Sequence, residues 1–165
     1  MKKEIMKREI VVLLDNIRSS HNVGSIFRTA DGAGVSKIIL SGYTPAPIDR
    51  FGRESKEIAK TSLGASDTVP WEAVTNEDAL ATLARYKQDG FEIVSVEQHQ
   101  DSISIYDYKP TAKTLYIFGN EIDGVSQELL QASDKIIEIP MKGKKESLNV
   151  SVTTGVALFQ NSLHS

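Results

Sequence analysis

The feature that most constrains the fold is a series of short apolar runs that alternate with helix-like segments along nearly the whole chain. The runs lack a polar residue at every second position, which is typical of strands buried on both faces of a parallel sheet. The five runs are Ile10–Leu14, Lys37–Leu40, Phe91–Val96, Thr114–Phe118 and Lys135–Ile139. We expect a strand in each, and Thr68–Trp71 is a candidate for a sixth.

The segments between the runs have helical character, and most carry a Ser, Thr, Asn or Asp near the start, where such side chains cap helices. The expected helices are Val23–Ala33, Ser55–Ser62, Asn76–Gln88, Ser126–Ala132 and Leu148–Leu163. Gly32, Gly34 and Gly90 stand at helix ends, where a positive φ is commonly needed. Alternation of strands and helices predicts an α/β fold, with a mostly parallel sheet and helices on both faces.

The length of 165 residues is typical of one domain, and neither a repeat nor a linker divides the chain. The longest apolar stretch, Ile10–Leu14, is far shorter than the roughly 20 residues that cross a bilayer, and Met1–Glu9 has no apolar segment of the signal-peptide kind. Cysteine is absent, and His21, His99 and His164 lack the spacing of metal ligands. We therefore expect a cytoplasmic protein without a bound metal or a membrane span.

The charge balance excludes binding of nucleic acid by bulk attraction alone, because 19 basic and 22 acidic residues give a formal charge of −3. Any binding of nucleic acid must therefore depend on a local cluster of basic residues. The basic residues gather in three places: Lys2, Lys3, Lys7 and Arg8; Arg50 and Arg53; and Lys142, Lys144 and Lys145. The first group is best explained as a solvated face. The third lies in a loop that contains a glycine and is the better candidate for a binding site.

The last helix has two apolar sides. Its main apolar stripe consists of Leu148, Val152, Val156, Phe159 and Leu163, whereas Val150, Ala157 and Leu158 lie off it. A helix of this kind needs two partners. One can be its own sheet, and the other is a second subunit or further parts of the same chain. The small residues Ser151, Thr153, Thr154 and Gly155 would let a neighbouring helix approach closely.

Three loops rich in small and polar residues follow expected strands: Asp15–Asn22, Gly119–Gly124 and Pro140–Asn149. Ligands of open α/β sheets bind outside the carboxyl ends of the strands, so these loops are where we expect a site. Glycine at 119 would allow a ligand to approach the backbone closely. Leu148 and backbone amides of the third loop could frame an apolar group of the size of adenine.

Several side chains of these loops and of the first helix are candidates for chemistry. Arg28 is either a clamp for a phosphate or carboxylate, or a member of a surface ion pair. Glu121 either orients an arginine or a substrate hydroxyl, or is a capping or exposed carboxylate. His21 and its neighbouring serines lack a Gly-x-Ser-x-Gly elbow, which disfavours a hydrolase. Gly32-Ala-Gly34 is not a dinucleotide fingerprint and no Walker motif is present, so a cofactor containing adenosine but no phosphate remains open.

Three motifs resemble the signature motifs of SpoU/TrmH-type RNA ribose 2′-O-methyltransferases of the SPOUT superfamily. They are Asn22-Val-Gly-Ser-Ile-Phe-Arg28-Thr-Ala, Leu115-Tyr-Ile-Phe-Gly-Asn-Glu121-Ile-Asp-Gly124, and Ile139-Pro-Met-Lys-Gly followed after three residues by Ser147-Leu-Asn-Val-Ser151. All three occur in the family's order and spacing, and they bracket residues 10–160.

The resemblance implies a single SpoU-type catalytic domain over residues 1–165, without a separate N-terminal RNA-binding domain. It further implies S-adenosylmethionine as cofactor, a C-terminal trefoil knot, and a homodimer with the active site near the subunit interface. The implied cofactor-binding residues are Gly119, Ile139, Met141, Leu148 and Asn149. The implied catalytic set is Asn22, Arg28, Glu121, Ser147 and Asn149. We expect Arg18, Lys142, Lys144 and Lys145 to contact the RNA, a tRNA or an rRNA.

Methyl transfer to a ribose 2′-hydroxyl requires a group that accepts or relays the hydroxyl proton. The resemblance gives this role to Arg28, but a guanidinium, which stays positively charged at neutral pH, is better suited to clamping a phosphate. Two alternatives to an enzyme of this family are a non-catalytic RNA-binding protein that keeps the knotted fold and an ordinary flavodoxin-like nucleotide-binding protein. Arg28, Glu121 and Asn149 argue against the first, and the missing phosphate loop argues against the second.

Overall fold

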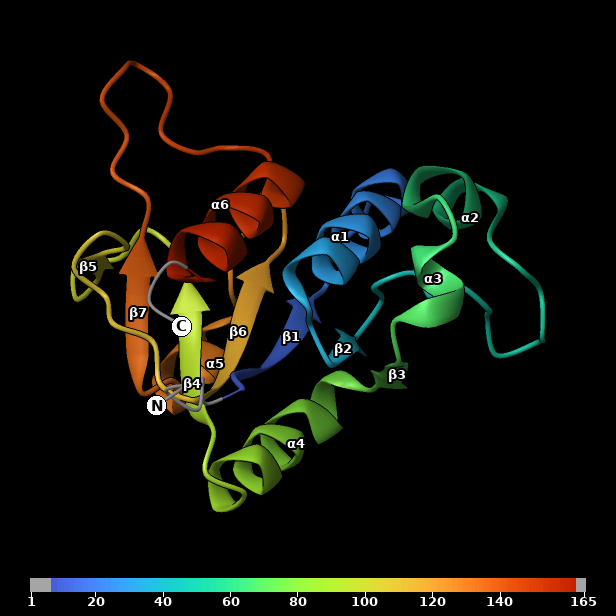
Figure 1. The fold of residues 1–165 in the computed structure, drawn as a ribbon, viewed down its shortest axis with the longest axis horizontal. Coiled ribbons are helices and arrows are strands. Elements are labelled where there is room, and N and C mark those ends of the chain that lie inside the picture. The colour runs from blue at the N-terminus through green and yellow to red at the C-terminus, as the bar shows by residue number, and fades with distance from the viewer. Residues whose placement is uncertain (1–6, 163–165) are drawn as a thin grey trace, which may run out of the picture.

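The computed structural model describes the backbone of residues 7–162 and the side chains of residues 7–160. Its centre is a seven-stranded sheet in the order β3-β2-β1-β6-β4-β7-β5, in which all paired strands are parallel (Figure 1). The strands are β1 Glu9–Asp15, β2 Lys37–Ser41, β3 Trp71–Val74, β4 Glu92–Val96, β5 Ile103–Ser104, β6 Lys113–Gly119 and β7 Lys135–Glu138. All five expected strands are confirmed.

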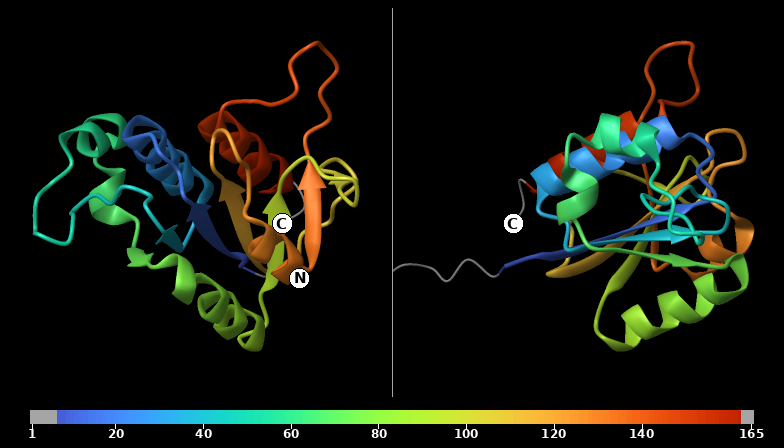
Figure 2. Two further views of the ribbon diagram at one scale, coloured as in Figure 1. Left: turned by 180° about the vertical axis from the view of Figure 1, so that it is seen from behind. Right: turned by 90° about the vertical axis from the view of Figure 1, so that its right-hand side faces the viewer.

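Helices cover both faces of this sheet, as the sequence predicts. One layer consists of α1 Ser20–Ala33, α2 Lys56–Ser62, α3 Ala65–Thr68 and α6 Val150–Ser162, and the other of α4 Asn76–Gln88 and α5 Gln127–Ala132. Figure 2 shows the two layers on opposite sides of the sheet. None of the helices within residues 7–162 has the length and apolar character that a bilayer crossing requires.

Strand β1 explains why its apolar run does not alternate with polar residues. Ile10, Val12 and Leu14 belong to the core beneath α1 and α6, whereas Val11 and Leu13 belong to the core beneath α4 and α5. None of the five is more than 5% exposed. A strand in the middle of a doubly covered sheet needs an apolar side chain at every position, because successive residues point to opposite faces.

Helix α1 begins earlier than Val23, where we expected it. Ser19 is its N-cap, with a φ of −86°, and the Ser19 hydroxyl accepts a 3.1 Å hydrogen bond from the backbone N–H of Asn22. The helix ends at Ala33 and is capped by Gly34, whose φ of 75° is a left-handed conformation that glycine adopts without strain.

Strand β3 corresponds to the candidate sixth strand of the sequence analysis. It begins at Trp71, where the expected segment Thr68–Trp71 ends. Thr68 instead ends the short helix α3 and Val69 is its C-cap. The carbonyl of Pro70 accepts a hydrogen bond from the backbone N–H of Ile38 just before the β2–β3 pairing starts. The short strand β5 was not predicted, because two residues are too few to produce a recognisable pattern.

Helix α6 has the two different sides that the sequence indicates. Its buried side carries Thr154, Ala157 and Leu158, all 0% exposed, and packs against the sheet beside α1. On the other side, Val152 and Phe159 are 50% and 47% exposed. The stripe residue Leu163 lies outside the described part of the chain. In a single chain, the main apolar stripe of α6 is therefore turned mostly outward, and of its described members only Val156 packs against the core.

Candidate active site

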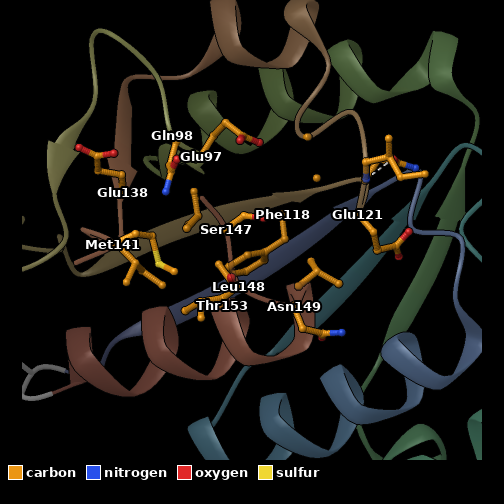
Figure 3. A pocket seen from close by; sticks show the side chains of 17 residues that line it. Glu97, Gln98, Phe118, Glu121, Glu138, Met141, Ser147, Leu148, Asn149 and Thr153 are labelled. Atoms are coloured by element: carbon orange, nitrogen blue, oxygen red, sulfur yellow. Dashed lines mark hydrogen bonds between the residues drawn. The ribbon is translucent and has the colours of Figure 1, made fainter. Parts of the chain in front are cut away.

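A cavity of about 390 Å³ opens at the carboxyl edge of the sheet, between the ends of β4, β6 and β7 and the start of α6 (Figure 3). Its volume lies within the roughly 300–1,000 Å³ that is usual for small-molecule sites. The lining residues lie within the segments 96–98, 118–124, 138–141 and 147–153. The second and third predicted loops thus meet here, together with the residues that follow β4.

The lining combines apolar side chains with carboxylates. Phe118, Ile139, Met141 and Leu148 supply apolar surface, and Figure 3 shows Phe118 and Leu148 near the middle of the cavity. Three glutamates also line it: Glu97, Glu121 and Glu138. No Lys or Arg side chain is among the lining residues of this described cavity, so its field favours a ligand that carries positive charge.

Gly119 ends β6 at a point where the chain folds back on itself. The backbone of Asn120 exchanges two hydrogen bonds with Gly124, of 3.1 and 2.9 Å, and Gly124 has a φ of 71°. A Cβ at position 119 would overlap the backbone of Gly124 and Val125. Glycine is therefore required at 119 by the loop's own backbone, and not only by a ligand as we expected.

Asn120 ties together the loops that follow three neighbouring strands. Its Nδ2 donates to the carbonyl of Asn16 and to the hydroxyl of Tyr43, both at 2.8 Å. Its Oδ1 accepts from the backbone N–H groups of Ile122 and Asp123 at 2.8 and 2.9 Å. Because this buried side chain uses both its donors and its acceptor, it fixes the loops after β1, β2 and β6 relative to one another.

Glu97 fixes the far end of the same loop. It directly follows β4, and its Oε2 accepts a 2.9 Å hydrogen bond from the backbone N–H of Val125. The carboxylate occupies the space that a side chain at Gly124 would need. We did not predict a role for Glu97, although a carboxylate immediately after a buried strand is a signal that could have identified it.

Glu121 contacts the start of α1. Its Oε1 and Oε2 each lie 3.1 Å from the backbone nitrogen of Arg18, and Oε1 lies 3.5 Å from that of Ser19. A negative charge next to a helix N-terminus is electrostatically favourable. Of the two interpretations of Glu121, the described contacts fit that of a cap, and its position in the lining also leaves it accessible to a ligand.

Asn149 directly precedes α6 and lines the cavity. Its Oδ1 accepts hydrogen bonds from the backbone N–H and the hydroxyl of Ser151, at 2.9 and 2.7 Å, and its carbonyl accepts one from Thr153. This capping arrangement holds Ser147 and Leu148 at the rim of the cavity, immediately before the helix. The expected start of this helix at Leu148 is therefore two residues early, because Val150 is its first residue.

The two candidates on α1 lie outside the cavity lining. Asn22 is 8% exposed, and Arg28 is an exposed residue on the part of α1 that runs beside α6. The residue after it, Thr29, faces Gly155 of α6. Within the described residues, Arg28 forms no ion pair with a carboxylate, so the contacts do not support the interpretation as a surface ion pair.

All five residues expected to bind the cofactor line the cavity: Gly119, Ile139, Met141, Leu148 and Asn149. Of the catalytic set, Glu121, Ser147 and Asn149 line it as well. The four residues expected to bind RNA, Arg18, Lys142, Lys144 and Lys145, are exposed in loops at the same edge of the sheet. The roles of all these residues stay predictions. The main lining residues that we did not predict are Glu97, Gln98, Phe118, Asn120, Glu138 and Thr153.

Asp15 is a buried carboxylate on the opposite side of this edge. Its Oδ2 accepts a 2.8 Å hydrogen bond from the backbone N–H of Ser126, the N-cap of α5. Burial raises the pKa of Asp15, and the hydrogen bonds from Ser126 oppose part of that shift. Across residues 7–162, no group of three or more His, Asp or Glu side chains is arranged to hold a metal ion.

The sequence and the fold are both similar to known proteins. The model of the SpoU rRNA Methylase family matches residues 9–159. The chain is 34% identical over 157 residues to a tRNA (guanosine(18)-2'-O)-methyltransferase of Aquifex aeolicus, covering 95% of this chain and 70% of the relative. It is 35% identical over 156 residues to the 23S rRNA (guanosine-2'-O-)-methyltransferase RlmB of Pectobacterium atrosepticum, covering 94% of this chain and 60% of that protein.

Solved structures have the same fold. An AdoMet-bound rRNA methyltransferase from Sinorhizobium meliloti superimposes with a TM-score of 0.83 and 30% identity, over 96% of this chain and 57% of that chain. The A. aeolicus TrmH/SpoU tRNA modifying enzyme gives a TM-score of 0.81 and 31% identity, over 96% and 78%. This chain thus spans only part of the length of these relatives. The family match over nearly the whole chain, together with these likenesses, establishes that the chain belongs to the SpoU rRNA Methylase family.

Proposed function

We propose that this chain is an RNA ribose 2′-O-methyltransferase of the cytoplasm that uses S-adenosylmethionine as its methyl donor and a tRNA or an rRNA as its acceptor. The observation that carries the proposal is the cavity at the carboxyl edge of the sheet, where residues from separate motifs such as Gly119, Ile139 and Leu148 come together. Relatives that share 34% and 35% of their residues with this chain are named as methyltransferases of tRNA and of 23S rRNA.

The chemistry of the lining fits this cofactor. Ile139, Met141 and Leu148 can pack against adenine, which is flat and uncharged. Glu97, Glu121 and Glu138 put negative charge around a space that would hold a sulfonium and an ammonium group. The lining contains no cationic side chain suited to a phosphate, which agrees with a nucleoside cofactor and disfavours a nucleotide.

S-adenosylmethionine, when bound, supplies a methyl group activated by its attachment to a sulfonium. The work of the chain is then to hold the ribose hydroxyl in line with that methyl group and to help its proton leave, and much of the rate comes from such positioning. In this proposal Ser147 and Asn149, which line the cavity at its rim, contact the ribose, and Glu121 offers carboxylate oxygens near the start of α1.

Arg28 fits a role that depends on a second subunit. It is exposed, has no ion-pair partner among the described residues, and is carried by the helix beside the outward apolar stripe of α6. We propose that this stripe forms the interface of a homodimer, and that Arg28 there clamps a phosphate of the RNA next to the reacting ribose. The proposal includes the C-terminal trefoil knot, which chain tracing of the C-terminal segment in a crystal structure would test.

The test is to measure cofactor binding by calorimetry and methyl transfer from labelled S-adenosylmethionine to total cellular RNA, followed by mapping of the modified nucleotide. We expect binding of the cofactor and of its demethylated product, and a methyl group on a ribose 2′-oxygen. Arg28→Ala should abolish turnover with little change in cofactor affinity. Failure of the wild-type protein to bind the cofactor would refute the proposal, and binding without transfer to any RNA would favour a non-catalytic RNA-binding protein.

A further inference from the structure

The loop between β2 and α2 contains a small closed turn that the proposed chemistry does not use. Ile48 and Glu54 form an antiparallel bridge at its base, and the backbone N–H of Asp49 donates a 2.9 Å hydrogen bond to the carbonyl of Arg53. Gly52, with a φ of 78°, donates to the carbonyl of Asp49 at 3.0 Å. We call residues 48–54 the Phe51 turn.

The carboxylate of Asp49 stabilises this turn from within. Its Oδ1 accepts hydrogen bonds from the backbone N–H groups of Phe51 and Arg53, at 2.9 and 3.0 Å, and its Oδ2 accepts one from Nε of Arg53 at 2.8 Å. The hydrogen bond from the Arg53 backbone contributes most to lowering the pKa of Asp49. The turn is thus held in one conformation although it lies at the surface.

The turn presents an exposed aromatic ring with two cations beside it. Phe51 is 67% exposed, and the guanidinium carbons of Arg50 and Arg53 lie 4.7 and 5.1 Å from the centroid of its ring. Within the described residues, Arg50 has no carboxylate partner. A single exposed apolar side chain is ordinary. A rigid turn that combines an exposed ring with two guanidinium groups matches what proteins use to stack an unpaired RNA base and contact its phosphates.

The position of the turn relates it to the cavity. The loop that contains it leaves the same carboxyl edge of the sheet, and Tyr43 at its start is hydrogen-bonded through its hydroxyl to Asn120 in the cavity lining. Figure 1 shows this loop at the opposite end of the molecule from the projecting loop between β7 and α6, which carries Lys142, Lys144 and Lys145. Basic residues therefore lie at both ends of this edge, close to the cavity in the loop between β7 and α6 and farther from it in the Phe51 turn, in a chain with a formal charge of −3.

We propose that the Phe51 turn is a docking site for an unpaired segment of the substrate RNA, in which a base stacks on Phe51 or on a guanidinium plane and Arg50 contacts a phosphate. The inference rests on the proposed function, because that function supplies the RNA. It adds a site outside the cavity that would contribute to RNA affinity without touching the methyl donor.

The experiment measures RNA affinity of the 165-residue chain by fluorescence anisotropy, with a labelled single-stranded RNA oligonucleotide of mixed sequence and with unfractionated tRNA. We expect Phe51→Ala to weaken binding of the oligonucleotide by about tenfold, which is within the range for loss of one base–aromatic stack. Because this change removes no charge, the salt dependence should stay the same. Arg50→Gln should weaken binding and reduce the slope of log K against log salt by about 0.7, the value for one phosphate contact on a single strand.

Two matched controls separate the turn from general surface effects. Ile48→Ala removes an exposed apolar side chain from the same turn, and Lys60→Gln removes an exposed positive charge from the neighbouring helix α2. Both should leave RNA affinity within about twofold of the wild type. Asp49→Ala keeps the ring and both arginines but removes the hydrogen bonds that hold the turn, and it should weaken binding because those groups lose their fixed arrangement.

The inference is overturned if Phe51→Ala binds RNA like the wild type, or if Arg50→Gln and Lys60→Gln have equal effects. Calorimetry with S-adenosylmethionine on every variant keeps this outcome distinct from a failure of the proposed function. Unchanged RNA affinity in variants of a protein that binds cofactor and methylates RNA refutes only the docking site. A wild-type protein that neither binds cofactor nor methylates RNA refutes the function itself.

Discussion

Val125 donates its backbone N–H to Oε2 of Glu97 over 2.9 Å, and this hydrogen bond joins the end of β4 to the loop that follows β6. Val125 is 4% exposed, so its N–H has little access to water as an alternative partner. The same carboxylate lines the cavity. One side chain therefore shapes the loop and contributes negative charge to the space in which we place the cofactor.

Substitution of Glu97 should separate these two effects. Glu97→Gln keeps an oxygen that accepts from Val125 but removes the charge, whereas Glu97→Ala removes both. We expect Glu97→Ala to lower the free energy of unfolding by about 1–3 kcal/mol, because a buried N–H loses its partner, and Glu97→Gln to lower it less. Both should weaken binding of S-adenosylmethionine more than binding of the demethylated product, which lacks the sulfonium charge. Calorimetry with the two ligands and urea unfolding measure these effects, and equal losses for both ligands would contradict the charge argument.

Gly119→Ala should destabilise the loop that forms one wall of the cavity. The added Cβ would overlap the backbone of Gly124 and Val125, so the loop must move, at a cost of about 1–3 kcal/mol typical of overpacking. We expect a lower free energy of unfolding and a loss of cofactor affinity. Gly143→Ala is the matched control, since a Cβ there meets nothing within 4 Å. Similar behaviour of the two variants in unfolding and calorimetry would show that crowding at position 119 is unimportant.

Val152→Lys should convert a dimer to monomers if the outward stripe of α6 is the subunit interface. Val152 is 50% exposed in the single chain, so a lysine there can fold normally but would place a charge in an apolar contact. Sedimentation measurements of the wild type and the variant test this, with Leu80→Lys as control, because Leu80 is 44% exposed on α4 at the other face of the sheet. A variant that stays dimeric would place the interface elsewhere.

Asp15→Asn should change how stability depends on pH. Burial raises the pKa of Asp15 above its ordinary value of 3.8, so the folded protein holds a proton that the unfolded chain releases. As pH rises from 3.8 through the raised pKa, this residue makes folding less favourable, and below 3.8 the penalty disappears. Asparagine cannot ionise, and its side-chain oxygen can still accept from Ser126.

The stability of Asp15→Asn relative to the wild type should therefore increase as pH rises from below 3.8 toward neutrality. Urea unfolding of both proteins across this pH range measures the difference between their free energies of unfolding. The titration of all other carboxylates contributes equally to both proteins and therefore cancels in this difference. A difference that does not vary with pH would mean that Asp15 has the same pKa in the folded and unfolded states.

The strand and helix pattern could be predicted because a strand that is buried on both faces of a sheet has an uninterrupted apolar sequence. Ile10–Leu14 has no polar interruption, since its residues serve two cores at once. The strand after α3 was placed too early, because nothing in Thr68–Trp71 itself shows that a short helix ends there and that pairing with β2 starts only at Trp71. Capping by Ser19 was missed for a similar reason, as several residues near the start of α1 can act as caps.

By itself, the sequence determined the alternation of strands and helices and the three motifs, because each of these depends only on residues that are near one another in the chain. Only the tertiary structure decided that Glu97 lines the cavity with Leu148, that Asn120 joins Asn16 to Tyr43, and that the main apolar stripe of α6 faces outward. These relationships depend on which strands lie side by side in the sheet. Strand order arises from the packing of the whole chain, and it cannot be deduced from any local sequence pattern.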